Sequence, residues 1–172
     1  KMTGTLTIIL SFASYAFVIL AMFRLFRINY FNPIVKIFAT YLEPISKSIF
    51  FFLNPLLAAL ALALLLQFVS LYLAYSSGYE PLTLLFISII NVINSCFRIL
   101  FYCVIGSVIL SWVAPGNNHP LLQIVEEMSG AILQPIRKFV PPMGGLDFTP
   151  IIGLMLLNLI NTSFIQIISS MV

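Results

Sequence analysis

Four long apolar runs divide the chain, and each is long enough to cross a lipid bilayer. They fall at about residues 6–26, 54–75, 82–112 and 149–168. A spanning helix needs about 20 apolar residues, because the hydrocarbon core is about 30 Å thick and a helix rises about 1.5 Å per residue. The runs therefore predict four transmembrane helices, and the first is expected to be one of them rather than a cleaved signal sequence.

Two segments between these runs carry apolar and polar residues at helical spacing. In residues 33–49 the polar side chains recur every three or four positions and form a stripe opposite an apolar one. This pattern predicts an amphipathic helix that lies in the headgroup plane and that Pro44 should kink or divide. Residues 120–139 repeat the pattern at a shift of 87 residues without a gap, so that Pro33 corresponds to Pro120.

The two segments give the chain an internal repeat. Residues 1–80 and 81–172 each contain a spanning helix, an interfacial amphipathic helix and a second spanning helix. We therefore predict an all-α membrane protein built from two repeats, and a repeat constrains the whole architecture. The copies differ in chemistry, because Phe50 and Phe51 stand where the basic pair 137–138 falls in the second copy.

Composition and charge agree with a membrane protein and indicate an orientation. The chain is 61% hydrophobic and 8% charged, whereas a soluble domain has about 45–50% apolar and about 25% charged residues. We attribute the net charge of +3 to the positive-inside bias and expect no nucleic-acid partner. The basic connections should face the cytoplasm, with both termini outside and both repeats in the same direction. The residues that set this bias are Arg24, Arg27, Lys36, Lys47, Arg137 and Lys138.

Polar residues inside two of the runs form a candidate intramembrane cluster. An arginine near the middle of a span costs at least about 2.5–3.5 kcal/mol on insertion scales. Either these side chains join helices through hydrogen bonds of about 0.6 kcal/mol each, or they line a path for an ion or small solute. The runs contain no Asp or Glu, which argues against a proton-coupled or cation-binding carboxylate site. The cluster comprises Asn91, Asn94, Arg98, Asn158 and Asn161.

The segment 134–150 is the other distinctive region. Its basic pair can hold anionic headgroups at about 1 kcal/mol per charge, and its two glycines permit a tight turn. Asp147 is expected either to cap the last helix or to pair with the basic residues, and Thr149 is expected to be the N-cap of that helix. The segment is either a structured re-entry loop or a contact surface. Its candidate lipid or partner contacts are Arg137, Lys138, Met143, Gly144, Gly145 and Asp147.

The sequence offers little to an enzyme or a cofactor. His119 is the only histidine, so the chain cannot supply paired histidines for haem or zinc. Cys96 and Cys103 are seven residues apart in one helical run, about 10 Å and too far for a disulfide. The chain also lacks a phosphate-binding glycine loop and hydrolase motifs. We therefore predict no catalytic residues, no metal and no cofactor.

The second half resembles a known family. The resemblance rests on Ser111-Trp112-Val113, on Pro135-Ile136-Arg137-Lys138 and on the string from Pro142 to Pro150, with a looser match at Phe31-Asn32-Pro33. These motifs resemble the YggT family, also called YlmG-like, of bacterial and plastid membrane proteins. The resemblance implies duplicated membrane units without known catalytic residues. Members have been associated with osmotic and potassium homeostasis, with cell or plastid division and with assembly of membrane complexes.

Two functions remain open at this point. The first is a non-catalytic accessory or assembly factor of the bacterial inner membrane, which packs against a larger membrane complex or self-associates. A thin bundle of four helices supports this function, because it encloses little core of its own. The alternative is transport of an ion or osmolyte, such as potassium, through a polar path between helices.

Overall fold

The computed structural model describes residues 2–113, 116, 118–140 and 147–170, and these residues form α-helices and no strand. Four of the helices are long and apolar enough to cross a membrane, as the apolar runs predict. Proline begins four of the six helices, where its missing N–H costs nothing, and α2 continues through Pro44 without division. The helices are α1 (Met2–Leu25), α2 (Pro33–Ile49), α3 (Pro55–Tyr75), α4 (Pro81–Val113), α5 (Pro120–Arg137) and α6 (Thr149–Ser169).

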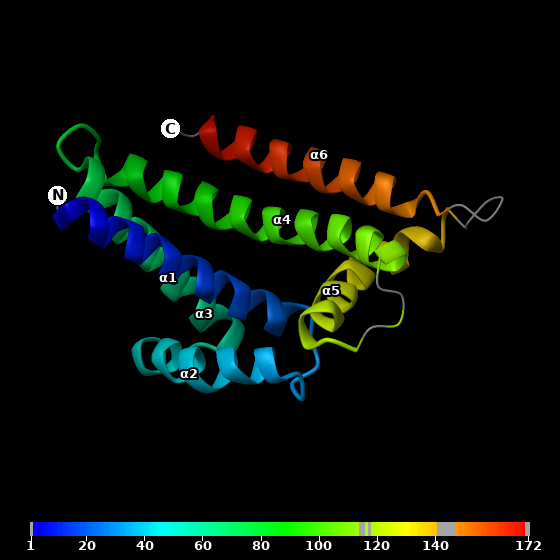
Figure 1. The fold of residues 1–172 in the computed structure, drawn as a ribbon. Coiled ribbons are helices and arrows are strands. Elements are labelled where there is room, and N and C mark those ends of the chain that lie inside the picture. The colour runs from blue at the N-terminus through cyan, green and yellow to red at the C-terminus, as the bar shows by residue number, and fades with distance from the viewer. Residues whose placement is uncertain (1, 114–115, 117, 141–146, 171–172) are drawn as a thin grey trace.

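The spanning helices form a row rather than a closed bundle. Helix α1 packs against α3, and both contact α4 on one side (Figure 1). Helix α6 lies on the other side of α4, where it contacts only α4 and α5 among the described elements. Because α6 stands at the edge of the row, most of its surface is left uncovered by the rest of the chain.

The core lies where α1, α3 and α4 meet, and small residues allow the backbones to approach closely. Ala58, Ala59 and Ala63 on α3 are fully buried. The Ser14 hydroxyl of α1 donates to the Ala63 carbonyl oxygen at 2.7 Å. Small residues and hydroxyl bonds are the usual means of holding helices together when lipid removes the hydrophobic driving force.

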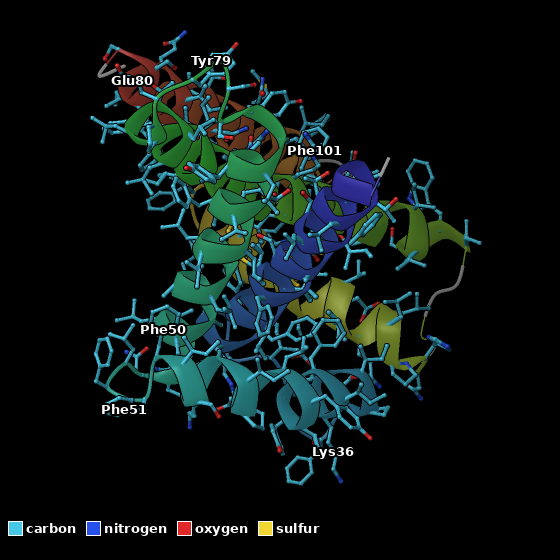
Figure 2. The ribbon with its side chains drawn as sticks, turned by 90° about the vertical axis from the view of Figure 1, so that its left-hand side faces the viewer. Lys36, Phe50, Phe51, Tyr79, Glu80 and Phe101 are labelled. Carbon is cyan, nitrogen blue, oxygen red and sulfur yellow. The ribbon has the colours of Figure 1, made fainter. Side chains whose placement is uncertain are left out.

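Helices α2 and α5 lie where α1 and α4 end, away from the termini. The N-terminus, the C-terminus and the turn after α3 gather at one end of the row (Figure 1). Figure 2 shows α2 crossing the start of α3. Lys36, Phe50 and Phe51 lie at this end of the molecule, and Tyr79 and Glu80 lie at the opposite end. The basic connections of the sequence therefore share one end of the molecule.

The surface of α2 has three sectors. One sector, which includes Val35 and Ala39, is buried against α1 and α3. A second carries the exposed charges of Lys36 and Lys47, and Lys47 lies 3.3 Å from a carboxylate oxygen of Glu43. The third sector is apolar and exposed, and it consists of Ile37, Tyr41, Ile45 and Ile49.

Candidate functional site

The candidate intramembrane cluster lines an open cavity between α4 and α6. The two helices lie side by side, and the side chains of Asn94 and Arg98 on α4 face those of Asn158 and Asn161 on α6 across a cavity of about 250 Å³. Phe97, Phe101, Tyr102 and Leu157 complete its wall. The structure therefore brings four of the five predicted polar residues together.

Asn91 is the member that stands apart. It is half-buried one turn before Asn94, and its backbone carbonyl accepts from the Ser95 hydroxyl at 2.8 Å. It does not line the cavity between α4 and α6. Helical spacing placed it on the same face of α4, but the sequence could not show where α6 meets that face.

A single hydrogen bond joins the polar side chains that α4 and α6 contribute to this cavity. The Asn161 side-chain amide Nδ2 donates to Oδ1 of Asn94 at 3.1 Å. The Asn161 Oδ1 atom is buried and has no partner among the described residues. A buried acceptor without a donor is costly, so this pair holds α4 to α6 but leaves hydrogen-bonding capacity unused.

Arg98 is exposed although it lies inside a spanning helix. No ion pair joins it to any residue that the structure describes. Asn158 beside it is also exposed. In an isolated copy these groups would face lipid, where a charged side chain is expensive. The α4–α6 face, defined by Asn94, Arg98, Asn158 and Asn161, therefore has the character of an uncovered contact surface.

A second polar site forms where α5 ends and α6 begins. Asp147 Oδ2 accepts from Arg137 Nη2 at 2.9 Å and from Arg137 Nε at 3.2 Å. Its Oδ1 accepts from the Thr149 hydroxyl and from the Thr149 backbone N–H at 3.0 Å. Hydrogen bonds from Thr149, followed by the Arg137 guanidinium, hold the pKa of the Asp147 carboxyl below its usual value.

One detail of this site differs from expectation, and the pairing of Asp147 with Arg137 agrees with it. Thr149 is the first residue of α6 rather than its N-cap, which is Phe148, and Asp147 supplies the oxygen that accepts the Thr149 N–H. Arg137 forms an ion pair with Asp147, which partly neutralises the Arg137 charge. Lys138 is exposed. Met143, Gly144 and Gly145, predicted as contacts, lie outside the described residues.

A polar joint between the two halves was missed by the sequence reasoning. The Asn32 side-chain Nδ2 donates to the Pro120 carbonyl oxygen at 2.8 Å, and the Asn29 N–H donates to Glu127 Oε2 at 2.9 Å. Asn32 also caps α2 by accepting from the Ile34 N–H at 3.0 Å. The Asn-Pro signal indicated a helix start, but no local pattern indicates a partner 88 residues away.

Comparison with known proteins places the chain. A family profile described as CCB3/YggT matches residues 86–168. An uncharacterized protein of Pseudomonas aeruginosa is 36% identical over 157 residues, covering 86% of this chain and 80% of the relative. The chain belongs to the YggT family. The family named from the sequence motifs is therefore confirmed.

Other YggT-family relatives are more distant or shorter in overlap. An uncharacterized Haemophilus influenzae protein is 26% identical over 149 residues, or 84% of this chain and 81% of that protein. The Escherichia coli protein named YggT is 32% identical over 72 residues, or 42% of this chain and 38% of that protein. No solved structure matches the chain. These relatives are uncharacterized, so the function has to be inferred from the site itself.

Proposed function

We propose that this YggT-family protein is a non-catalytic accessory factor of the bacterial inner membrane that binds another membrane protein through the α4–α6 face. The observation that carries the proposal is the exposure of Arg98 within a spanning helix, in the open cavity between α4 and α6. A partner helix laid over this face would remove Arg98 from lipid.

The charge of Arg98 indicates what that partner carries. The four spans of this chain contain no Asp or Glu. A second copy would therefore bring another Arg98 to the interface and no counter-charge. A transmembrane helix of a different protein with an Asp or Glu at the same depth would neutralise it, because intramembrane charges pair with one another. This reasoning favours a hetero-complex over self-association.

The direction of the two repeats is part of the same proposal. Five of the eight lysines and arginines lie in the connections that contain α2 and α5, and Arg24 is in the last turn of α1 next to one of them. This supports a cytoplasmic position for those helices and an outside position for both termini. Each repeat would then consist of two spanning helices and one interfacial helix, with Lys36 and Lys138 near anionic headgroups.

Purification in mild detergent tests the association. The wild-type protein is expected to co-purify with one membrane protein in a fixed ratio, and Arg98→Leu to reduce its recovery by roughly tenfold, the effect of losing a charge pair of about 1.4 kcal/mol. Arg98→Lys keeps the charge and should retain part of the recovery. Arg27→Asn is the matched control, because Arg27 is exposed outside the spans and Asn tolerates its positive φ of 53°. Equal recovery from wild type and Arg98→Leu would overturn the proposal.

Transport is the second candidate, because the same four polar side chains line a cavity. That cavity opens on the side of the molecule, so a continuous path would need a second copy or a partner to close it. Protein reconstituted in liposomes would then pass potassium or a small solute, and Arg98→Leu would change the flux. Liposomes that hold folded protein and show no flux would exclude transport by this protein alone.

A further inference from the structure

A second, larger cavity lies where the end of α4, the length of α5 and the start of α6 meet. Its volume is about 680 Å³. It lies apart from the α4–α6 face described above, and the two cavities share no lining residue. Its polar lining comes from Ser107 and Ser111 on α4, from Glu126 and Ser129 on α5, and from the Arg137–Asp147 ion pair at the other end of the cavity.

The three serine hydroxyls in this cavity already donate their protons to backbone carbonyl oxygens, so toward a ligand they can only accept hydrogen bonds. Ser107 donates to the Val104 carbonyl oxygen at 2.9 Å, and Ser111 donates to the Val108 carbonyl oxygen at 2.7 Å. Ser129 donates to the Glu126 carbonyl oxygen at 3.1 Å. A hydroxyl has one proton and two lone pairs, so each oxygen still has room to accept from a ligand.

Glu126 adds a negative charge to the same lining. Its side chain makes no ion pair with any residue in the described part of the chain. An ionised carboxylate only accepts hydrogen bonds. The cavity therefore offers a carboxylate and several hydroxyl oxygens, which suit a ligand that is positively charged and rich in N–H donors. A primary ammonium group has three such donors, whereas a quaternary ammonium group has none.

The position of the cavity indicates where that ammonium group comes from. Trp112 on its rim is 82% exposed and ends an apolar helix, a position that tryptophan favours at the membrane–water interface. Val108, Leu133 and Ile151 give the same cavity an apolar wall. A ligand with both an ammonium headgroup and hydrocarbon chains fits such a lining better than a soluble amine does.

We propose that this cavity binds the headgroup of phosphatidylethanolamine. The ammonium group donates to the Glu126 carboxylate and to the hydroxyl oxygens of Ser107 and Ser129. Arg137 and Asp147 line the other end of the same cavity, about three turns from Glu126 along α5, where they bond to each other rather than to this headgroup.

Lipid retention by the full-length protein tests the site. Protein is equilibrated with mixed micelles that contain equal amounts of phosphatidylethanolamine and phosphatidylcholine with matched acyl chains, and the retained lipids are counted by native mass spectrometry. Wild type is expected to retain phosphatidylethanolamine roughly tenfold better, the effect of one charge-assisted hydrogen bond. Glu126→Gln should abolish the preference, while Glu126→Asp should keep part of it.

The control is Glu80→Gln, which removes one exposed carboxylate at the opposite end of the row (Figure 2). It should leave the lipid preference unchanged. Because Glu126 is exposed, its substitution is not expected to unfold the protein, and an unchanged helical circular dichroism spectrum would establish this. Equal retention of the two lipids by wild type would overturn the proposal, and so would an unaltered preference in Glu126→Gln. Displacement of the lipid by millimolar free ethanolamine would also contradict it, because the site would then recognise a soluble amine.

Discussion

At the scale of single residues, Asp147 shows how one carboxylate positions a spanning helix. One of its oxygens accepts from Thr149, at the first position of α6, and the other accepts from Arg137, at the end of α5. Asp147 therefore links the end of α5 to the start of α6. It also places negative charge at the N-terminus of α6, where the helix dipole favours it.

Asp147→Asn is expected to destabilise the protein by about 0.5–1 kcal/mol near neutral pH, because Asn keeps an oxygen for the Thr149 N–H but loses the negative charge that pairs with Arg137 and favours the N-terminus of α6. The folded-state pKa of Asp147 is below its ordinary value of 3.8, so its contribution is complete above that value and is lost as the pH falls through the depressed folded pKa. The difference in melting temperature between wild type and variant should therefore shrink between about pH 7 and about pH 3. A difference that stays constant over this range, measured by circular dichroism in detergent, would contradict the assignment.

The sequence allowed only some of the site residues to be predicted. Arg98 and the asparagines stood out because polar groups are rare inside apolar runs. Whether they pointed into the bundle or out of it depended on where α6 packs, and the structure shows Arg98 exposed. Glu126 gave no such signal, because a glutamate on an amphipathic helix is ordinary, and only the approach of α4 makes it part of a cavity.

At the scale of elements, Asn32 joins α2 to α5. It caps α2 and also donates to the first residue of α5, and it is almost fully buried. Asn54 caps α3 in the same way, since its Oδ1 accepts from the Leu57 N–H at 2.8 Å, but it is exposed. The two residues share one local motif, Asn followed by Pro, and differ in their long-range contact.

Asn32→Ala is therefore expected to destabilise the protein more than Asn54→Ala. Each variant loses a cap of about 1 kcal/mol, and Asn32→Ala also loses a buried hydrogen bond and leaves the Pro120 carbonyl oxygen without that donor, about 1–3 kcal/mol more. Thermal or denaturant unfolding in the same detergent measures the difference. Equal destabilisation of the two variants would mean that the joint between α2 and α5 contributes nothing.

The exposed apolar sector of α2 predicts how that helix meets the bilayer. Tyr41 belongs to this sector, whereas the adjacent exposed residue Thr40 lies on the polar stripe. With Trp112→Phe as the background, a tryptophan introduced by Tyr41→Trp should be quenched by lipids brominated near the top of their chains. The matched Thr40→Trp variant should be quenched far less. Equal quenching at both positions would contradict an in-plane α2.

The helices themselves were predictable to within four residues, because span length and amphipathic period follow from bilayer thickness and helix geometry. The apolar run 82–112 became α4 at Pro81–Val113, and the segment 33–49 became α2 with the same bounds. Of the kink or division expected at Pro44, the division is wrong, since α2 continues through this residue. The repeat remains a prediction, because agreement in the order of elements does not establish a duplicated unit.

At the scale of the whole molecule, the row of helices explains why this protein should need a partner. Helix α6 contacts only α4 and α5 among the described elements, and an open cavity lies between α4 and α6. Arg98 lines that cavity, and the four spans contain no carboxylate to pair with it. A protein that acted alone would gain by replacing Arg98 with an apolar residue, whereas a protein that docks gains specificity from it.

Site-specific photo-crosslinking in intact cells tests this central claim most directly. A photoreactive amino acid is placed at Asn158, beside Arg98 on the α4–α6 face, or at Ile160, which is exposed at nearly the same depth but turned about 160° around α6. Position 158 should give one discrete adduct with another membrane protein, and position 160 should not. Arg98→Leu should remove that adduct. Adducts of equal yield from both positions, an adduct only between copies of this chain, or an adduct that survives Arg98→Leu would contradict the account.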